Sequence, residues 1–183
     1  MTRGKKTALI LAVVILAAVV GCAVYVNDYY AADSEALAAL ADTEWVTVVQ
    51  QEDLTAFCPE NAEAGLIFYP GGSMAASYAA EQAQALEGLI LLAAYSTADL
   101  TETGLEVLSL YGTEDGVLNR QKYESSRVNL PEGFREVIIE GGNHAQFGSY
   151  GPQEGDGTAA ITQTAQIRQT ADAIAAWMQE MGS

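Results

Sequence analysis

The chain contains one histidine, His144, in a glycine-rich segment, and an aspartate, Asp115, in a second segment that also contains glycine. Each follows a run that predicts a strand, residues 105–111 before Asp115 and residues 135–140 before His144. An imidazole exchanges protons near neutral pH, and a carboxylate beside it holds one ring tautomer and stabilises the protonated ring. An acid and then a histidine match the last two members of a Ser–Asp–His triad. The pair is therefore a candidate acid and base for nucleophilic catalysis.

Both residues also have an ordinary structural interpretation, which the sequence alone leaves open. Asp115 precedes Gly116, and Asp-Gly is a common turn pair in which the aspartate bonds to its own backbone. A histidine in a loop can likewise be held by neighbouring carbonyl groups. The glycines around His144 nevertheless permit close backbone approach, which suits a functional loop better than a helix face would.

Strands and helices that alternate along the chain must bring this pair together. Strands are predicted where apolar, β-branched and aromatic residues cluster, and the continuous apolar run at 88–95 is typical of a strand covered on both faces. Alternation predicts an α/β fold with a mostly parallel sheet and helices on both faces, whose chemistry lies in loops beyond the carboxyl ends of the strands. The predicted strands are 44–50, 65–69, 88–95, 105–111 and 135–140, the predicted helices are 34–41, 73–86, 120–128 and 158–181, and the loops are 70–72, 96–99, 112–116 and 141–157.

The caps and faces of two of these helices can also be predicted. Ser34 is expected to cap the first, and Asp156 or Thr158 is expected to cap the helix at 158–181. The apolar face expected of this last helix consists of Ile161, Ala165, Ile167, Ala171, Ile174, Ala175 and Met178.

The amino terminus has the pattern of a membrane segment. Residues 7–26 carry no charge, and twenty helical residues cross roughly 30 Å of hydrocarbon. Basic residues precede this run, so we expect 1–6 to be a cytoplasmic basic tail, 7–26 a transmembrane signal anchor and 27–183 an extracytoplasmic domain. One alternative is a cleaved signal peptide. The other is a lipoprotein anchored at Cys22, because the residues before that cysteine loosely resemble a lipobox.

Composition excludes several classes of function. Half of the 183 residues are hydrophobic, which is enough for a packed core and argues against a disordered chain. There are 8 basic and 24 acidic side chains, and beyond residue 26 only five are basic, so we expect no nucleic-acid binding. Two cysteines, Cys22 and Cys58, and one histidine cannot build a zinc site of the usual kinds, and a disulfide between the two cysteines is doubtful. We expect no metal and no cofactor.

Five segments together resemble a bacterial, membrane-anchored branch of the α/β hydrolases, of the fold-5 type. They are Gly-Leu-Ile-Phe-Tyr-Pro-Gly-Gly at 65–72, Gly-Leu-Ile-Leu-Leu-Ala-Ala-Tyr at 88–95, Tyr-Gly-Thr-Glu-Asp-Gly at 111–116, Gly-Gly-Asn-His-Ala-Gln-Phe-Gly at 141–148 and Tyr-Gly-Pro-Gln-Glu-Gly-Asp-Gly at 150–157. The resemblance covers nearly the whole chain. It implies an extracytoplasmic hydrolase of ester or similar acyl bonds, with Asp115 as triad acid, His144 as triad base and the backbone near Gly71 and Gly72 in the oxyanion loop.

The sequence departs from this family at the nucleophile. The elbow G-x-S-x-G is absent, and the simplest account is an internal deletion that fuses two Gly-Gly pairs at Gly71-Gly72. Tyr69 then occupies the nucleophile's position, and the remaining strand at 65–69 takes either its own place or that of the lost elbow strand. Ser73 is a weak substitute, because it lies about 6 Å along the helix axis from the elbow and suits a helix N-cap better. Ser96 follows a different strand and lacks the elbow glycines.

Three interpretations follow. The first is a membrane-anchored serine hydrolase of small ester-like substrates, impaired because the nucleophile is missing. The second is a non-catalytic pseudo-hydrolase that binds a small molecule or a partner outside the membrane. The third is an error of the reading frame across 69–73, whose true product would contain the missing segment.

Overall fold

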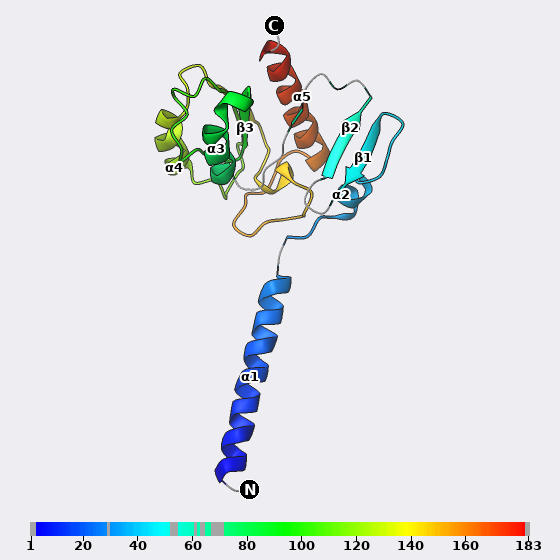
Figure 1. The fold of residues 1–183 in the computed structure, drawn as a ribbon, viewed down its shortest axis with the longest axis vertical. Coiled ribbons are helices and arrows are strands. Elements are labelled where there is room, and N and C mark those ends of the chain that lie inside the picture. The colour runs from blue at the N-terminus through cyan, green and yellow to red at the C-terminus, as the bar shows by residue number, and fades with distance from the viewer. Residues whose placement is uncertain are drawn as a thin grey trace. The chain divides into compact units, whose positions relative to one another are not determined.

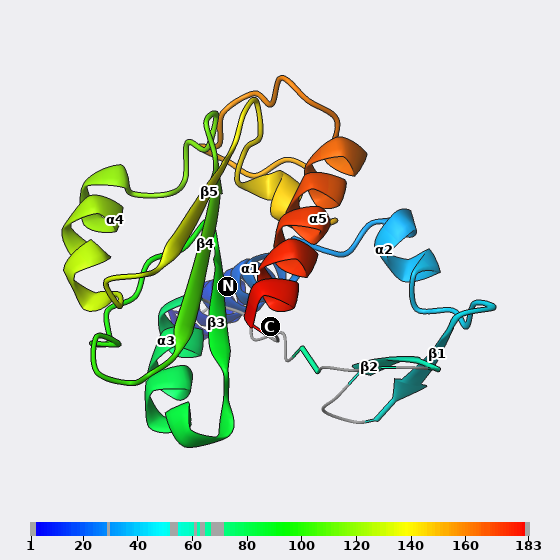
Figure 2. The same ribbon diagram turned by 90° about the horizontal axis from the view of Figure 1, so that it is seen from above.

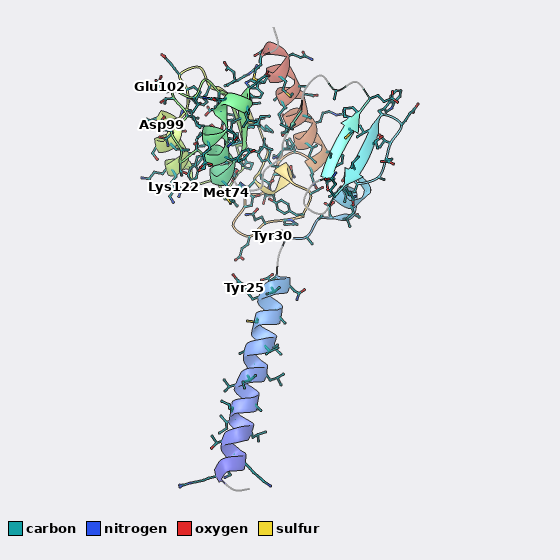
Figure 3. The ribbon with its side chains drawn as sticks, in the orientation of Figure 1. Tyr25, Tyr30, Met74, Asp99, Glu102 and Lys122 are labelled. Atoms are coloured by element: carbon teal, nitrogen blue, oxygen red, sulfur yellow. The ribbon has the colours of Figure 1, made fainter. Side chains whose placement is uncertain are left out.

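The computed structural model describes residues 3–28, 30–51, 55–60, 62, 65–66 and 72–181, except for the side chains of Ala8 and Ser73. The chain forms two compact units, Met1–Ala31 and Ala32–Ser183 (Figure 1). Helix α1, Arg3–Asn27, makes up most of the first unit. Its side chains project outward along its length and Tyr25 lies near its end (Figure 3). Within the described residues, α1 is the one helix long and apolar enough to cross a membrane, a test that a signal sequence also passes.

A parallel sheet organises the second unit. Its strands are β3 (Gly88–Leu92), β4 (Glu106–Gly112) and β5 (Arg135–Ile139), in the order β3-β4-β5. Both pairs are parallel, with Leu89 beside Val107 and Leu110 beside Val137. The middle strand, β4, is almost entirely buried, as its mostly apolar sequence predicts, and Ser109 within it is buried too.

Helices cover both faces of this sheet, so the predicted α/β fold class is confirmed (Figure 2). On one face, α3 (Gly72–Glu81) packs its alanines against alternate residues of β3 and β4, among them Leu89, Leu91 and Val107. On the other face, α5 (Gln163–Met181) places Trp177 against Leu108 and Leu110. Successive side chains of a strand point to opposite faces, so β4 supplies both cores at once.

The remaining predicted helices are shorter than expected. α3 ends at Glu81 and a 3₁₀ turn, Ala83–Ala85, completes the helix predicted at 73–86. α4 spans Arg120–Ser126 and continues into a 3₁₀ turn, Arg127–Asn129. Tyr123 of α4 reaches the sheet, where its hydroxyl is 2.9 Å from Ser109 Oγ and donates to Glu136 Oε1 at 2.6 Å.

The strand predicted at 44–50 is confirmed, but it does not belong to the parallel sheet. β1 (Val46–Gln50) pairs antiparallel with β2 (Thr55–Pro59) in a separate two-stranded sheet. β2 was not predicted, because its sequence, Thr-Ala-Phe-Cys-Pro, contains no sustained apolar run. Of the strand predicted at 65–69, only Gly65 and Leu66 are described, and neither lies in a strand.

Both predicted caps are also wrong. α2 (Ser34–Ala38) is capped by Asp33, whose carboxylate accepts from the backbone N–H groups of Glu35 and Ala36. α5 begins at Gln163, five residues later than predicted, and Thr162 Oγ1 accepts from Ala165 N at 3.2 Å. Asp156 and Thr158 are therefore too far upstream to cap it.

The predicted apolar face of α5 is wrong in part. Gln166 and Thr170 are buried, whereas Ile167 is 42% exposed. Two polar side chains can line this face because each is hydrogen-bonded: the Gln166 amide to the backbone of Asn143, and Thr170 Oγ1 to Gln166 O.

Candidate active site

Asp115 lies in the turn that follows β4, at the carboxyl end of the sheet's middle strand. Its Oδ1 accepts hydrogen bonds from Val117 N at 2.9 Å and from Leu118 N at 2.7 Å. These bonds fix the carboxylate within its own loop and leave Oδ2 facing His144. The Asp115 side chain is fully buried, so the pair is screened little by water.

His144 comes from the loop after β5, at the start of a 3₁₀ turn, Ala145–Phe147. Its Nδ1 is 3.0 Å from Asp115 Oδ2, and the imidazole remains 23% exposed. Because an ionised carboxylate only accepts, Nδ1 carries the proton and donates it, and the neutral ring presents the Nε2 lone pair. No side chain in the described part of the chain is hydrogen-bonded to Nε2.

The contact shifts the pKa of both groups in the direction of an ion pair. The hydrogen bond to Asp115 raises the pKa of His144, although burial opposes it, and the charges of Asp115 and Asp156 add to the rise. Burial would raise the pKa of Asp115, but the hydrogen bonds from His144 and Leu118 outweigh it and lower that pKa. Such opposed shifts are typical of an acid–base pair in a functional site.

The loops after β4 and β5 are joined directly. Thr113 Oγ1 accepts from Gly141 N at 2.8 Å, and Glu114 N donates to Gly142 O at 2.8 Å. Gly112 lies so close to Gly142 that a Cβ at Gly112 would overlap its carbonyl group. Glycine is therefore required at this crossing, and the two loops hold the acid and the base at one edge of the sheet.

Two further residues hold the histidine loop, and the sequence analysis missed both roles. Gln166, fully buried on α5, accepts from Asn143 N at 3.0 Å and donates to Asn143 O at 2.8 Å. Asp156, expected to be a helix cap, instead accepts from the backbone of Gly116, His144 and Ala145. Asp156 belongs to the motif at 150–157, but residue spacing alone does not distinguish an aspartate that caps a helix from one that bridges two loops.

Most of the residues considered for the nucleophile and the oxyanion loop are not among the described residues. Tyr69 and Gly71 lie outside the described residues, as does the Ser73 side chain. Gly72 is the first residue of α3, and a Cβ there would overlap Ala94 Cβ. Ser96, the other serine considered, is buried and its hydroxyl donates to Ala98 O at 2.7 Å.

Neither cysteine lies near a set of metal ligands. Cys22 and Cys58 are exposed free thiols. Among the residues that the structure describes, no three of His, Cys, Asp and Glu are grouped so that they could hold a metal ion.

Comparison with known proteins supports this interpretation of the fold. A family model described as the alpha/beta hydrolase family matches residues 64–168, which is more than half of the chain and includes Asp115, His144, Asp156 and Gln166. The search of curated proteins and the search of solved structures each found no match. On the strength of the family match, the chain belongs to the alpha/beta hydrolase family.

Proposed function

We propose that this protein is a serine-hydrolase-type member of the family, built to cleave ester or similar acyl bonds and impaired by loss of its nucleophile. The observation that carries the proposal is the 3.0 Å contact between His144 Nδ1 and the buried carboxylate of Asp115. Both side chains lie in loops that follow the carboxyl ends of parallel strands, which is where this architecture places its catalytic residues.

In this proposal His144 is the general base and Asp115 orients it. A substrate-attacking hydroxyl gives its proton to Nε2, and the carboxylate stabilises the imidazolium that results. Backbone N–H groups near Gly71 and Gly72 are the proposed donors to the oxyanion. With the elbow serine absent, water is the remaining nucleophile for the base to activate, so turnover is expected to be slow.

One feature of the second unit supports the proposed deletion. Gly72, at the start of α3, approaches Ala94 too closely for any side chain, as expected of a helix that once followed a sharp elbow. Re-sequencing the coding DNA across residues 69–73 tests whether the junction is genuine.

Hydrolysis of an activated ester such as p-nitrophenyl acetate tests the proposed activity. The full chain should accelerate hydrolysis weakly, and the rate should rise with pH through the His144 titration because only the neutral imidazole accepts a proton. His144→Ala should reduce the rate to the buffer background, and Asp115→Asn should reduce it too. Equal rates for His144→Ala and the natural chain would show that the pair is not a catalytic base.

The alternative, a pseudo-hydrolase that binds a small molecule, is favoured by one observation. A cavity of about 480 Å³ lies along β3, and its lining is predominantly apolar, with Tyr78, Leu91, Trp177 and Met178 among its residues. Trp177 fluorescence would report an apolar ligand in this cavity. A saturable change that disappears in Trp177→Phe, together with no ester hydrolysis, would favour binding over catalysis.

We also propose that α1 anchors the protein in the cell membrane, with residues 1–6 in the cytoplasm, 7–26 in the membrane and 27–183 outside. The charge-free helix supports a span, and the basic residues before it favour this orientation. A membrane-impermeant maleimide applied to intact cells should label Cys58 and leave Cys58→Ser unlabelled. A lipoprotein would carry a lipid on Cys22 and begin at that residue, and a cleaved protein would lack α1, so intact mass distinguishes all three.

A further inference from the structure

The carboxylate of Asp156 is surrounded by backbone N–H groups from both halves of the candidate site. Its Oδ1 accepts from Gly116 N at 3.1 Å and from His144 N at 3.2 Å, and its Oδ2 accepts from Ala145 N at 2.8 Å. A fourth bond, from Gly157 N at 2.9 Å, comes from its own segment. Hydrogen bonds to an ionised acceptor are stronger than those between neutral groups. The Asp156 carboxylate therefore holds these backbone segments firmly in place.

These contacts connect the two loops that carry the acid and the base. Gly116 is the residue directly after Asp115, and His144 is the base itself. Gly116 also approaches the backbone of Gly155 and Gly157 so closely that a Cβ there would displace them. One side chain from the segment before α5 therefore bridges the loops of Asp115 and His144, in addition to the direct bonds between those loops.

Asp156 differs from Gln166, which holds the same loop, in that it carries charge. The side-chain amide of Gln166 is neutral and bonds to the backbone of Asn143, whereas Asp156 places a second negative charge near the imidazole. Among the described residues, the charges that act on the ring are those of Asp115, from the loop after β4, and Asp156, from the loop before α5. Asp156 therefore affects both the position of the ring and its charge.

We propose that Asp156 is a positioning residue for the Asp115–His144 pair: it joins the acid loop to the base loop and stabilises the imidazolium that forms when His144 takes a proton. This role rests on the proposed function, because an imidazolium forms during turnover only if His144 acts as the base. The hydrogen bonds described above for the Asp156 carboxylate come from backbone N–H groups, so it acts on the ring through the backbone and through its negative charge.

The sole histidine makes a direct test available. In the full chain in detergent micelles, the ring resonances of His144 give its pKa by NMR without any substrate. Asp156→Asn removes the charge and one acceptor oxygen, so the His144 pKa should fall below that of the natural chain. Asp172→Asn removes the same charge from an exposed position on α5 and should leave the His144 pKa unchanged.

A His144 pKa that is the same in Asp156→Asn and Asp172→Asn would overturn the proposal. If Asp156→Asn does not fold, Asp156→Glu keeps the charge but moves the carboxylate by one methylene, and a smaller fall in the His144 pKa is expected. An unchanged His144 pKa in Asp156→Glu would then refute the positioning role. Because the titration needs no catalysis, the proposed hydrolase function can fail in the ester assay while this result stands.

Discussion

Replacing Asp115 by asparagine tests how much the acid–base pair contributes to the folded state. The carboxylate accepts three hydrogen bonds, from Val117 N and Leu118 N on one oxygen and from His144 Nδ1 on the other. Asparagine has only one acceptor oxygen, so it can serve either the two backbone groups or the ring, and its NH₂ group must face a donor. The lost bond joins charged partners, which corresponds to about 1.5–3 kcal/mol of unfolding free energy.

The loss should depend on pH in a defined way. The raised pKa of His144 contributes stability that is fully present below the unfolded value of 6.5 and is lost as pH rises through the folded pKa. The lowered pKa of Asp115 contributes stability that is present above its unfolded value of 3.8 and is lost as pH falls through its folded pKa. The pair is therefore most stabilising between these two values, and Asp115→Asn should cost most near pH 5–6 and less near pH 9.

Urea unfolding of the full chain in detergent, followed by tryptophan fluorescence at pH 5.5 and pH 9, measures this difference. Asp172→Asn, on the exposed face of α5, is the matched control and should change the unfolding free energy little at either pH. The reasoning would be refuted if Asp115→Asn were as stable as the natural chain at pH 5.5, or if its loss of stability were the same at both pH values.

Three further substitutions test the packing and hydrogen bonds that support the site. Leu110→Ala, at a fully buried position of β4, should lower the unfolding free energy by about 2–5 kcal/mol in urea, whereas a loss below 1 kcal/mol would contradict the core assignment. Gly72→Ala should cost about 1–3 kcal/mol because the new methyl overlaps Ala94, and Gly133→Ala, which meets no atom within 4 Å, should cost far less. Gln166→Leu should cost about 1–3 kcal/mol for each backbone group left unpaired and should speed amide exchange in the histidine loop; unchanged exchange would disprove its role.

The acid and base could be predicted from the sequence because their signals are local. Asp115 and His144 each directly follow a strongly apolar run, and parallel strands bring their carboxyl ends to one edge. The structure places the two side chains in contact, which chain order alone could only suggest. The bounds predicted for strand β4 agree to within one residue, since this buried middle strand is mostly apolar.

Other features depend on contacts that no local pattern shows. Helix α5 begins after a glycine-rich loop, so its first residue is hard to predict. Asp156 resembles an N-cap in sequence because an aspartate that caps a helix and one that bridges two loops both accept hydrogen bonds from backbone N–H groups. The apolar face expected of α5 omits Gln166, because a polar side chain is not expected to be buried there. Its burial is tolerated because the amide makes two hydrogen bonds to the backbone of Asn143. Strand β1 follows from the run of β-branched and aromatic residues at 44–50, whereas β2 and its pairing with β1 have no comparable signal in the sequence.

Labelling of the full chain with a fluorophosphonate probe, with the adduct located by mass spectrometry, tests the central claim most directly. The probe reacts with a serine only when a base has activated it. If the acid and the base are in place and the nucleophile is missing, the natural chain and His144→Ala should both remain unlabelled. An adduct on a serine of the natural chain that is absent from His144→Ala would contradict this account.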